Sequence, residues 1–267
     1  MASMDACAKY LGQFLPVEQV LWARYFVQST LITVFLWRRE GTNFLYCHKP
    51  VLQFIRSLSL ISATACAYLV FQYLSLSDAT AIFFFAPVLV TILSGVILKE
   101  PITVGNILIV LCGFAGVLII IQPGASAFEW ISLSPLFCAF MLATYLLMTR
   151  VLQTTDKESS TMFYSTAIGS IGLSFVMPFT WVNPDPNTIF FMVLIGSLGT
   201  LGHFALIKAF GFSSASSLSP FLYAQLLFAT VLSVLIFEDS LTSHFVLGTV
   251  ILVGSGLAQW KLNKRNV

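Results

Sequence analysis

The sequence predicts an all-α polytopic membrane protein, a bundle whose helices cross a bilayer many times. Composition, the length of the apolar runs and an internal repeat lead to this class. Of the 267 residues, 58% are hydrophobic and only 9% are charged, whereas soluble domains carry about 25% charged residues. A soluble fold could not cover so much apolar surface, but a bilayer removes the need to do so.

Nine apolar runs match the roughly 20 residues that a spanning helix needs. The runs are continuous rather than alternating, which disfavours a membrane β-barrel. Short connectors with turn residues, such as Gln122-Pro123-Gly124, separate them. The predicted spans cover residues 17–37, 51–74, 78–98, 103–121, 130–150, 160–182, 188–208, 214–237 and 242–260.

Basic residues predict the orientation. With the C-terminus inside, alternate connectors contain ten basic residues: Arg38, Arg39, Lys49, Lys99, Arg150, Lys157, Lys208, Lys261, Lys264 and Arg265. The opposite connectors after residue 74 contain no Lys or Arg, only the acidic residues Asp78, Glu129, Asp185, Glu238 and Asp239. By the positive-inside rule the first side is cytoplasmic. We therefore expect a bacterial inner-membrane protein with a cytoplasmic C-terminus.

The chain also repeats itself. A shift of 138 residues places Glu100 on Glu238, each at the end of a long apolar run. Because Glu100 falls on the predicted inside and Glu238 on the outside, the two copies are inverted in the membrane. Inverted repeats are typical of secondary transporters. The sequence thus predicts two halves, residues 1–121 and 122–267.

The repeat leaves the first helix incomplete. A shift of 141 residues places Arg150 on Lys9, so the helix that corresponds to 130–150 should begin before Met1. Only its second part, from Met1 to about Gln13, is expected within this sequence. We therefore predict a ten-helix bundle of five plus five helices whose first helix is truncated.

Several segments resemble the EamA-type family of the drug/metabolite transporter superfamily. They are Met4 to Leu11, Pro16 to Tyr25, Ala79 to Pro101 with Ala86-Pro87 at its centre, and Ser219 to Gln225 followed by Phe237-Glu238. The resemblance implies two inverted five-helix halves, cytoplasmic termini and a central cavity. The opening segments resemble a subgroup that contains riboflavin and S-adenosylmethionine uptake carriers. A non-ATP secondary transporter of a small organic metabolite, working by alternating access, is the implied function.

Ionisable groups within the apolar runs are the first candidates for the transport pathway, since they are costly in a membrane. Asp5 and Lys9 are four residues apart on one helix face and can neutralise each other. Arg24 lies about 10 Å along its span, with Gln28 one turn further. A guanidinium there could hold a carboxylate or phosphate, or it could reach the outer interface or form a fixed link to Asp5 or Glu18. Arg56 is nearer the inner surface, where we expect it to reach the headgroups.

Neutral polar residues form the second set of candidates. Tyr and Gln can hydrogen-bond a solute in apolar surroundings, which directs attention to Gln72, Tyr145, Tyr223 and Gln225. His203 could relay protons, although a lone histidine is more often a packing residue.

Two prolines lie within predicted spans, Pro87 near the middle of one and Pro220 six residues into another. Each removes a backbone hydrogen bond, and broken helices near the midplane mark binding sites in transporters. A simple packing kink is the alternative.

Other functions have weaker support. A net charge of +2 gives no reason to expect nucleic acid binding, and the five cysteines form no CxxC pair. There is no phosphate-binding loop and no histidine metal motif, so we expect no cofactor, no metal and no enzymatic activity. A non-transporting or degenerate membrane subunit remains an alternative, followed by an integral-membrane enzyme. The expected partners are the metabolite and the lipid bilayer, with a homodimer as an open arrangement.

Overall fold

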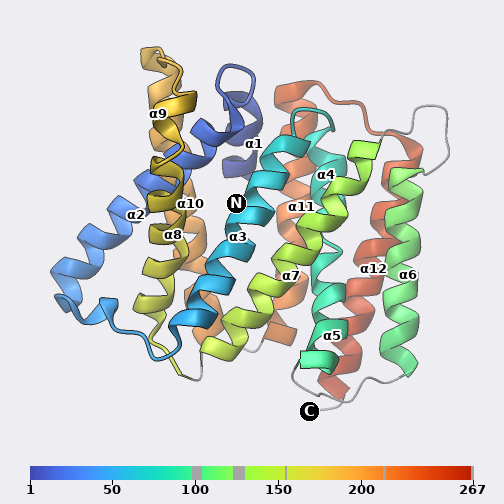
Figure 1. Cartoon of the computed structure of the whole chain (residues 1–267). Helices are drawn as coiled ribbons and strands as arrows, with labels where there is room; N and C mark the ends of the chain where they lie inside the picture. The colour runs from blue at the N-terminus through green and yellow to red at the C-terminus, as the bar shows by residue number, and fades with distance from the viewer. Residues whose placement is uncertain (98–103, 123–129, 154, 213–214, 266–267) are drawn as a thin grey trace.

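The computed structural model describes residues 1–97, 104–122, 130–153, 155–212 and 215–265 (Figure 1). Side-chain positions are described for these residues except 87, 91, 94–96, 130, 132, 207, 209–212, 215–224, 259 and 263–265. Glu100, Glu129, Pro123 and Gly124 therefore lie outside the described residues, as do the side chains of Pro87, Pro220 and Tyr223.

The described chain is α-helical. Its helices are α1 (Ala2–Leu11), α2 (Val17–Glu40), α3 (Pro50–Val70), α4 (Leu76–Phe83), α5 (Ala86–Ile97), α6 (Val104–Ile121), α7 (Ser134–Leu152), α8 (Glu158–Ser174), α9 (Met177–Thr180), α10 (Pro186–Phe212), α11 (Ala215–Phe237) and α12 (Ser243–Arg265), with 3-10 turns η1 (Asn43–Leu45) and η2 (Trp130–Leu133). Among the described residues, α2, α3, α6, α7, α10 and α12 are each long and apolar enough to cross a membrane. The predicted all-α polytopic fold is confirmed.

Local sequence signals account for several helix starts. Pro50 occupies the first position of α3, where its missing N–H costs nothing. At the start of α10, the Asp185 Oδ1 accepts a hydrogen bond of 3.0 Å from the backbone N–H of Thr188. The Ser75 Oγ likewise accepts from the backbone N–H of Asp78 and begins α4.

The predicted span 78–98 is not one continuous helix. The structure divides it into α4, which ends at Phe83, and α5, which begins at Ala86. Pro87 explains the break, since its ring conflicts with the carbonyl of residue 83 and it has no N–H to donate. Pro220 has no such effect, because α11 continues through it from Ala215 to Phe237.

Helices that are far apart in the sequence pack together. At one edge of the bundle α6 lies beside α12, and near the opposite edge α2 packs against α8 and α10 (Figure 1). Between them α3 packs along α7, while α1 contacts α10 and α11. Glycine allows the close approach of α6 and α12: a Cβ on Gly116 would lie 2.8 Å from the carbonyl oxygen of Gly248.

The outside of the bundle is apolar. Large side chains such as Phe175, Phe179 and Leu235 are 75%, 88% and 74% exposed. A soluble monomer rarely shows contiguous apolar surface on this scale. The outward side chains therefore suit hydrocarbon, while the polar groups considered next lie inside.

Candidate substrate cavity

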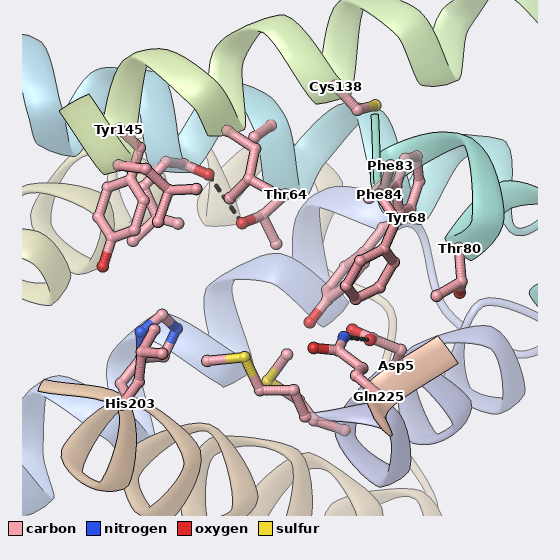
Figure 2. A pocket seen from close by; sticks show the side chains of 18 of the residues that line it. Asp5, Thr64, Tyr68, Thr80, Phe83, Phe84, Cys138, Tyr145, His203 and Gln225 are labelled. Carbon is pink, nitrogen blue, oxygen red and sulfur yellow. Dashed lines mark hydrogen bonds between the residues drawn. The ribbon is translucent and has the colours of Figure 1, made fainter. Parts of the chain in front are cut away.

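A cavity of about 150 Å³ lies between helices that come from distant parts of the sequence. Figure 2 shows it from close by. Its lining comprises Met1, Met4, Asp5, Arg24, Leu60, Ala63, Thr64, Ala67, Tyr68, Thr80, Phe83, Phe84, Cys138, Leu142, Tyr145, Leu146, His203, Leu206 and Gln225.

The lining divides into two chemical parts. The charged, imidazole and amide groups come from α1, α2, α10 and α11, in the form of Asp5, Arg24, His203 and Gln225. Helices α3 and α7 contribute an apolar wall, consisting of Leu60, Ala63, Ala67, Leu142 and Leu146, together with a few hydroxyl groups. A mostly apolar cavity with a few converging polar groups is the usual form of a small-molecule site.

Arg24 is only 3% exposed, so its charge lies inside the bundle and does not reach the interface. Its Nη1 donates to the Tyr68 hydroxyl at 3.5 Å, and its Nη2 lies 3.1 Å from the His203 Nε2. The Nε has no hydrogen-bond partner in the described part of the chain. Within that part, no carboxylate lies within 4.0 Å of the guanidinium. The buried cation therefore has a free donor and no carboxylate in direct contact, although Asp5 is close enough to interact with it electrostatically.

The contact between His203 and Arg24 fixes the state of the imidazole. Arginine offers only donors, so the Nε2 that faces it must be an acceptor. A neutral ring with its proton on Nδ1 satisfies this geometry, whereas an imidazolium would place two positive charges side by side. In this conformation His203 serves as a hydrogen-bond acceptor that orients the guanidinium.

Asp5 faces the cavity, but its partner differs from the one predicted. The Gln225 Nε2 donates to the Asp5 Oδ2 at 2.9 Å, as the dashed line in Figure 2 shows. Lys9 instead pairs with Asp239, with 2.9 Å between Nζ and Oδ2. The expected mutual neutralisation of Asp5 and Lys9 is therefore wrong. Gln225 of α11 contacts Asp5, and Asp239, which follows α11, contacts Lys9.

The carboxylate of Asp239 is the centre of a hydrogen-bond network at one end of the bundle. The Ser233 hydroxyl donates to Oδ2, and the backbone N–H of Ser77 donates to the Ser233 Oγ at 3.2 Å. The Lys9 Nζ also lies 4.7 Å from the centre of the Phe237 ring. This end of the bundle is thus tied together by hydrogen bonds that join α1, α4 and α11.

Arg56 does not reach the headgroups as the sequence led us to expect, since its side chain is fully buried. Its Nε donates to the Thr149 Oγ1 at 2.7 Å, and its Nη2 donates to the Tyr145 hydroxyl at 3.2 Å. The Nη1 binds the carbonyl oxygen of Thr161 at 3.1 Å and the hydroxyl of Ser165. Polar groups of α7 and α8 replace water around this cation and hold it in place.

A second polar link lies at the other end of the bundle. The Asp156 carboxylate, between α7 and α8, accepts from the backbone N–H of His48 and from the Gln53 Nε2, each at 2.8 Å. Gln53 also donates to the Thr161 Oγ1 at 3.1 Å. These bonds join the connector before α3 to the start of α8.

The structure brings some of the predicted site residues together and separates others. Asp5, Arg24, Tyr145, His203 and Gln225 line the cavity, and Figure 2 shows four of them directed towards it. Gln28 is buried on α2 but does not line the cavity. Lys9 and the exposed Gln72 also lie outside the lining, and Gln72 donates to the carbonyl oxygen of Gly12 at 3.2 Å.

Sequence reasoning missed three polar lining residues, Thr64, Tyr68 and Thr80. The signal for two of them was present: Thr64 and Tyr68 are four residues apart and so share one face of α3. In Figure 2 the Tyr68 hydroxyl points towards Asp5 and Gln225. Thr80 carried no comparable signal, and its hydroxyl has no partner in the described part of the chain.

No group of three or more His, Cys, Asp or Glu side chains in the described residues is arranged to hold a metal ion. The chemistry that the cavity offers is instead recognition, through one cation, one carboxylate, an amide and several hydroxyls.

Comparison with curated proteins gives relatives of similar length. The chain is 25% identical over 254 residues to the S-adenosylmethionine uptake transporter of Rickettsia prowazekii, covering 95% of this chain and 86% of that one. It is 31% identical over 183 residues to the riboflavin transporter of Vibrio cholerae, covering 67% and 61% of the two chains. A riboflavin transporter of Brucella anthropi is 22% identical over 263 residues, covering 96% and 93%.

A solved crystal structure superposes with a TM-score of 0.69. It covers 99% of this chain and 95% of the other at 14% identity, which supports the fold alone. The model of the EamA-like transporter family matches residues 1–122 and 130–257. Because these matches take in most of the sequence, the chain belongs to the EamA-like transporter family, a family of membrane transporters rather than enzymes.

Proposed function

We propose that this protein is a secondary carrier that moves a small organic metabolite across the bacterial inner membrane by alternating access. The cavity between the helices is the solute site, and Asp5, Arg24, Tyr145, His203 and Gln225 are the polar groups that meet the solute there. Lys9, Gln28, Gln72, Tyr223, Pro87 and Pro220 stay predictions as parts of the pathway. Gradients of protons or solutes drive the cycle, with no cofactor.

The observation that carries the proposal is the buried Arg24 guanidinium. It lines a cavity, keeps a donor free and has no carboxylate within 4.0 Å among the described residues. Burying a charge costs several kcal/mol unless the surrounding groups satisfy it, and the Nε–H of Arg24 has no partner among the described residues, so its own surroundings satisfy this cation only in part. A charged side chain inside a membrane bundle is by default a sign of function.

The two-half arrangement, residues 1–121 and 122–267, is supported by the way in which helices choose neighbours. Exchanging the two halves replaces α1 by α7, α2 by α8, α3 by α10 and α6 by α12, and the reverse. The contact of α3 with α7 then corresponds to that of α10 with α1, and the contact of α2 with α10 corresponds to that of α8 with α3. The contact of α6 with α12 corresponds to itself. Such an exchange of partners is expected of two inverted repeats around a central site.

Alternating access needs contacts that open at one end while they close at the other. The links of Lys9 to Asp239 and of Ser77 to Ser233 join the halves at one end of the bundle, and those of His48 and Gln53 to Asp156 join them at the other. In our proposal these links are the two gates. The break between α4 and α5 gives one helix pair a place to bend.

The distribution of Lys and Arg supports a cytoplasmic C-terminus. Fusing a fluorescent protein, which folds in the cytoplasm, or a periplasmically active phosphatase to Val267 tests this orientation: we expect fluorescence and no phosphatase activity. Assembly as a homodimer stays a prediction.

Uptake into proteoliposomes that contain the purified chain tests the proposal. The labelled panel consists of riboflavin, S-adenosylmethionine and amino acids, each with and without an imposed proton gradient. We expect saturable accumulation of at least one compound and its loss in Arg24→Ala. The matched control is Arg38→Ala, which removes an exposed arginine from the last turn of the same helix. Unchanged uptake in Arg24→Ala would show that Arg24 is not part of the solute pathway, whereas no uptake beyond protein-free liposomes for a folded protein would favour a non-transporting subunit instead.

A further inference from the structure

The polar groups of the cavity carry opposite charges at separate places. Arg24, with His203 beside it, supplies a cation from α2, while Asp5, held by Gln225, supplies an anion from α1. No ion pair within 4.0 Å joins Arg24 and Asp5 in the described chain. The two groups interact electrostatically without direct contact, so a third group that carries both charges can bind between them.

The surroundings of Arg24 fit a carboxylate. Its guanidinium offers parallel N–H groups in a fixed fork, which matches the two oxygens of a carboxylate. His203 and the Tyr68 hydroxyl fix the ends of this fork at 3.1 and 3.5 Å, and the Nε–H remains without a partner. The phenolic hydroxyl of Tyr68 can also donate to an incoming carboxylate.

The surroundings of Asp5 fit an ammonium group. The Gln225 amide uses one N–H on one carboxylate oxygen, and an ionised carboxylate accepts about four hydrogen bonds in all. Lys9, the nearest cation along α1, is occupied by Asp239 and does not line the cavity. Asp5 therefore retains acceptor capacity for a cation that enters from the cavity.

The rest of the lining fits an uncharged body. Leu60, Ala63, Leu142 and Leu146 form the wall on α3 and α7, and Phe83 adds an aromatic ring from α4. Burying apolar or aromatic atoms of a solute against these side chains is favourable. A neutral solute would use this wall but would leave both charges of the cavity desolvated and unpaired.

We propose that the solute is a zwitterion of the amino-acid type, with a carboxylate that binds Arg24, an ammonium group that binds Asp5 and Gln225, and an apolar or aromatic body against the wall of α3 and α7. This inference rests on the proposed function, since it assigns the cavity as the solute site. It separates two kinds of solute, one with an amino-acid head and one without charged groups.

Binding to the purified protein tests the inference independently of transport. The probes are matched compounds: phenylalanine, phenethylamine, which lacks the carboxylate, and 3-phenylpropionate, which lacks the ammonium group. S-adenosylmethionine and its decarboxylated form make a second pair, and riboflavin represents solutes without either group. Ligand-induced thermal stabilisation of the protein in detergent gives the apparent affinity.

We expect a zwitterion to bind about 10-fold to 100-fold more tightly than the analogue that lacks its carboxylate, the range for a charge-assisted hydrogen bond. Arg24→Gln should abolish this preference, and Arg24→Lys should retain part of it, since it keeps the charge without the fork. Asp5→Asn should reduce the preference for zwitterion over 3-phenylpropionate. Arg38→Gln, on the exposed end of α2, should leave every preference unchanged.

The outcomes for the two proposals are distinct. Equal binding of both members of each pair, or binding and uptake of riboflavin in preference to every zwitterion, overturns the zwitterion inference and leaves the carrier proposal intact. Preferential zwitterion binding that depends on Arg24, without uptake into proteoliposomes, supports the inference and overturns the carrier. Neither binding nor uptake of any probe by a folded protein overturns both.

Discussion

Arg24 and Arg56 are both buried in helices of the bundle, but their surroundings differ. Arg56 is enclosed by the polar groups of Tyr145, Thr149, Thr161 and Ser165, which occupy its Nε, Nη1 and Nη2. Arg24 has hydrogen-bond contacts with His203 and Tyr68 at 3.1 and 3.5 Å, its Cζ lies 5.2 Å from the centre of the Tyr25 ring, and its Nε has no hydrogen-bond partner in the described residues.

The surrounding side chains thus use the hydrogen-bonding capacity of the Arg56 guanidinium, whereas they leave part of that of Arg24 unused. Arg56 does not line the cavity and only touches it through Tyr145, whose ring centre lies 4.6 Å from the Arg56 Cζ. Arg24 lines the cavity directly. We infer that burial alone does not mark a functional charge in a membrane bundle; unused hydrogen-bonding capacity beside a cavity does.

The largest effect on stability is expected from Arg56→Ala. The change removes the hydrogen bonds to α7 and α8 and leaves an empty volume between helices, at a cost of about 3 kcal/mol. Reversible denaturation of the protein in mixed detergent micelles measures the free energy of unfolding. Arg38→Ala, which truncates an exposed arginine, is the control. If Arg56→Ala were as stable as this control, the network around Arg56 would not hold the helices together.

Arg24→Met should have a large effect on solute binding and a small effect on the free energy of unfolding. Removing a buried cation that no described carboxylate contacts relieves its desolvation cost, so we expect the free energy of unfolding to change by less than about 1 kcal/mol. Binding of a carboxylate-bearing solute should nevertheless be lost. The same denaturation assay, paired with thermal stabilisation by the probes, tests both statements. A loss of stability as large as that of Arg56→Ala would make Arg24 a second structural arginine.

The pair of Lys9 and Asp239 should give an intermediate effect. Its side chains are 13% and 20% exposed, so it is neither fully buried nor freely solvated. A double-mutant cycle with Lys9→Met and Asp239→Asn should yield a coupling energy of about 1 kcal/mol. A coupling energy near zero would show that Ser233 holds Asp239 without help from Lys9, and it would weaken the role of the pair as a gate.

The smallest effect is expected at Asp185, a solvated charge that contrasts with both arginines. Hydrogen bonds from the side chain and the backbone N–H of Thr188 lower the pKa of Asp185 below its usual value. A lowered pKa contributes stability above the unfolded-state value and loses it as the pH falls through the folded-state value. The melting temperature of Asp185→Asn should therefore depend slightly less on pH between about pH 5 and pH 2 than that of the unmodified chain. Identical profiles would mean that this cap contributes nothing.

The spans were predictable because hydrocarbon thickness sets the length of an apolar run, whichever neighbours the helix later meets. The partners of the buried charges were not. Asp5 lies four residues from Lys9, yet its partner is Gln225, 220 residues away. Arg56 was expected at the headgroups because nothing local indicates the hydroxyls of Thr149 and Ser165. Such contacts depend on which helix faces meet, and faces are hard to assign where both protein and lipid are apolar.

The cavity wall on α3 and α7 and the charged groups on α1 and α2 belong to different helices, so they can vary separately. Exchanging Leu142 or Leu146 for a larger or smaller aliphatic residue reshapes the space for the body of a solute and leaves the charged head groups unmoved. For the solute site that we propose, selection can thus change which body is accepted one methylene at a time and leave the groups that orient the solute in place. A lineage with this division can change its solute by small steps that each keep a binding site.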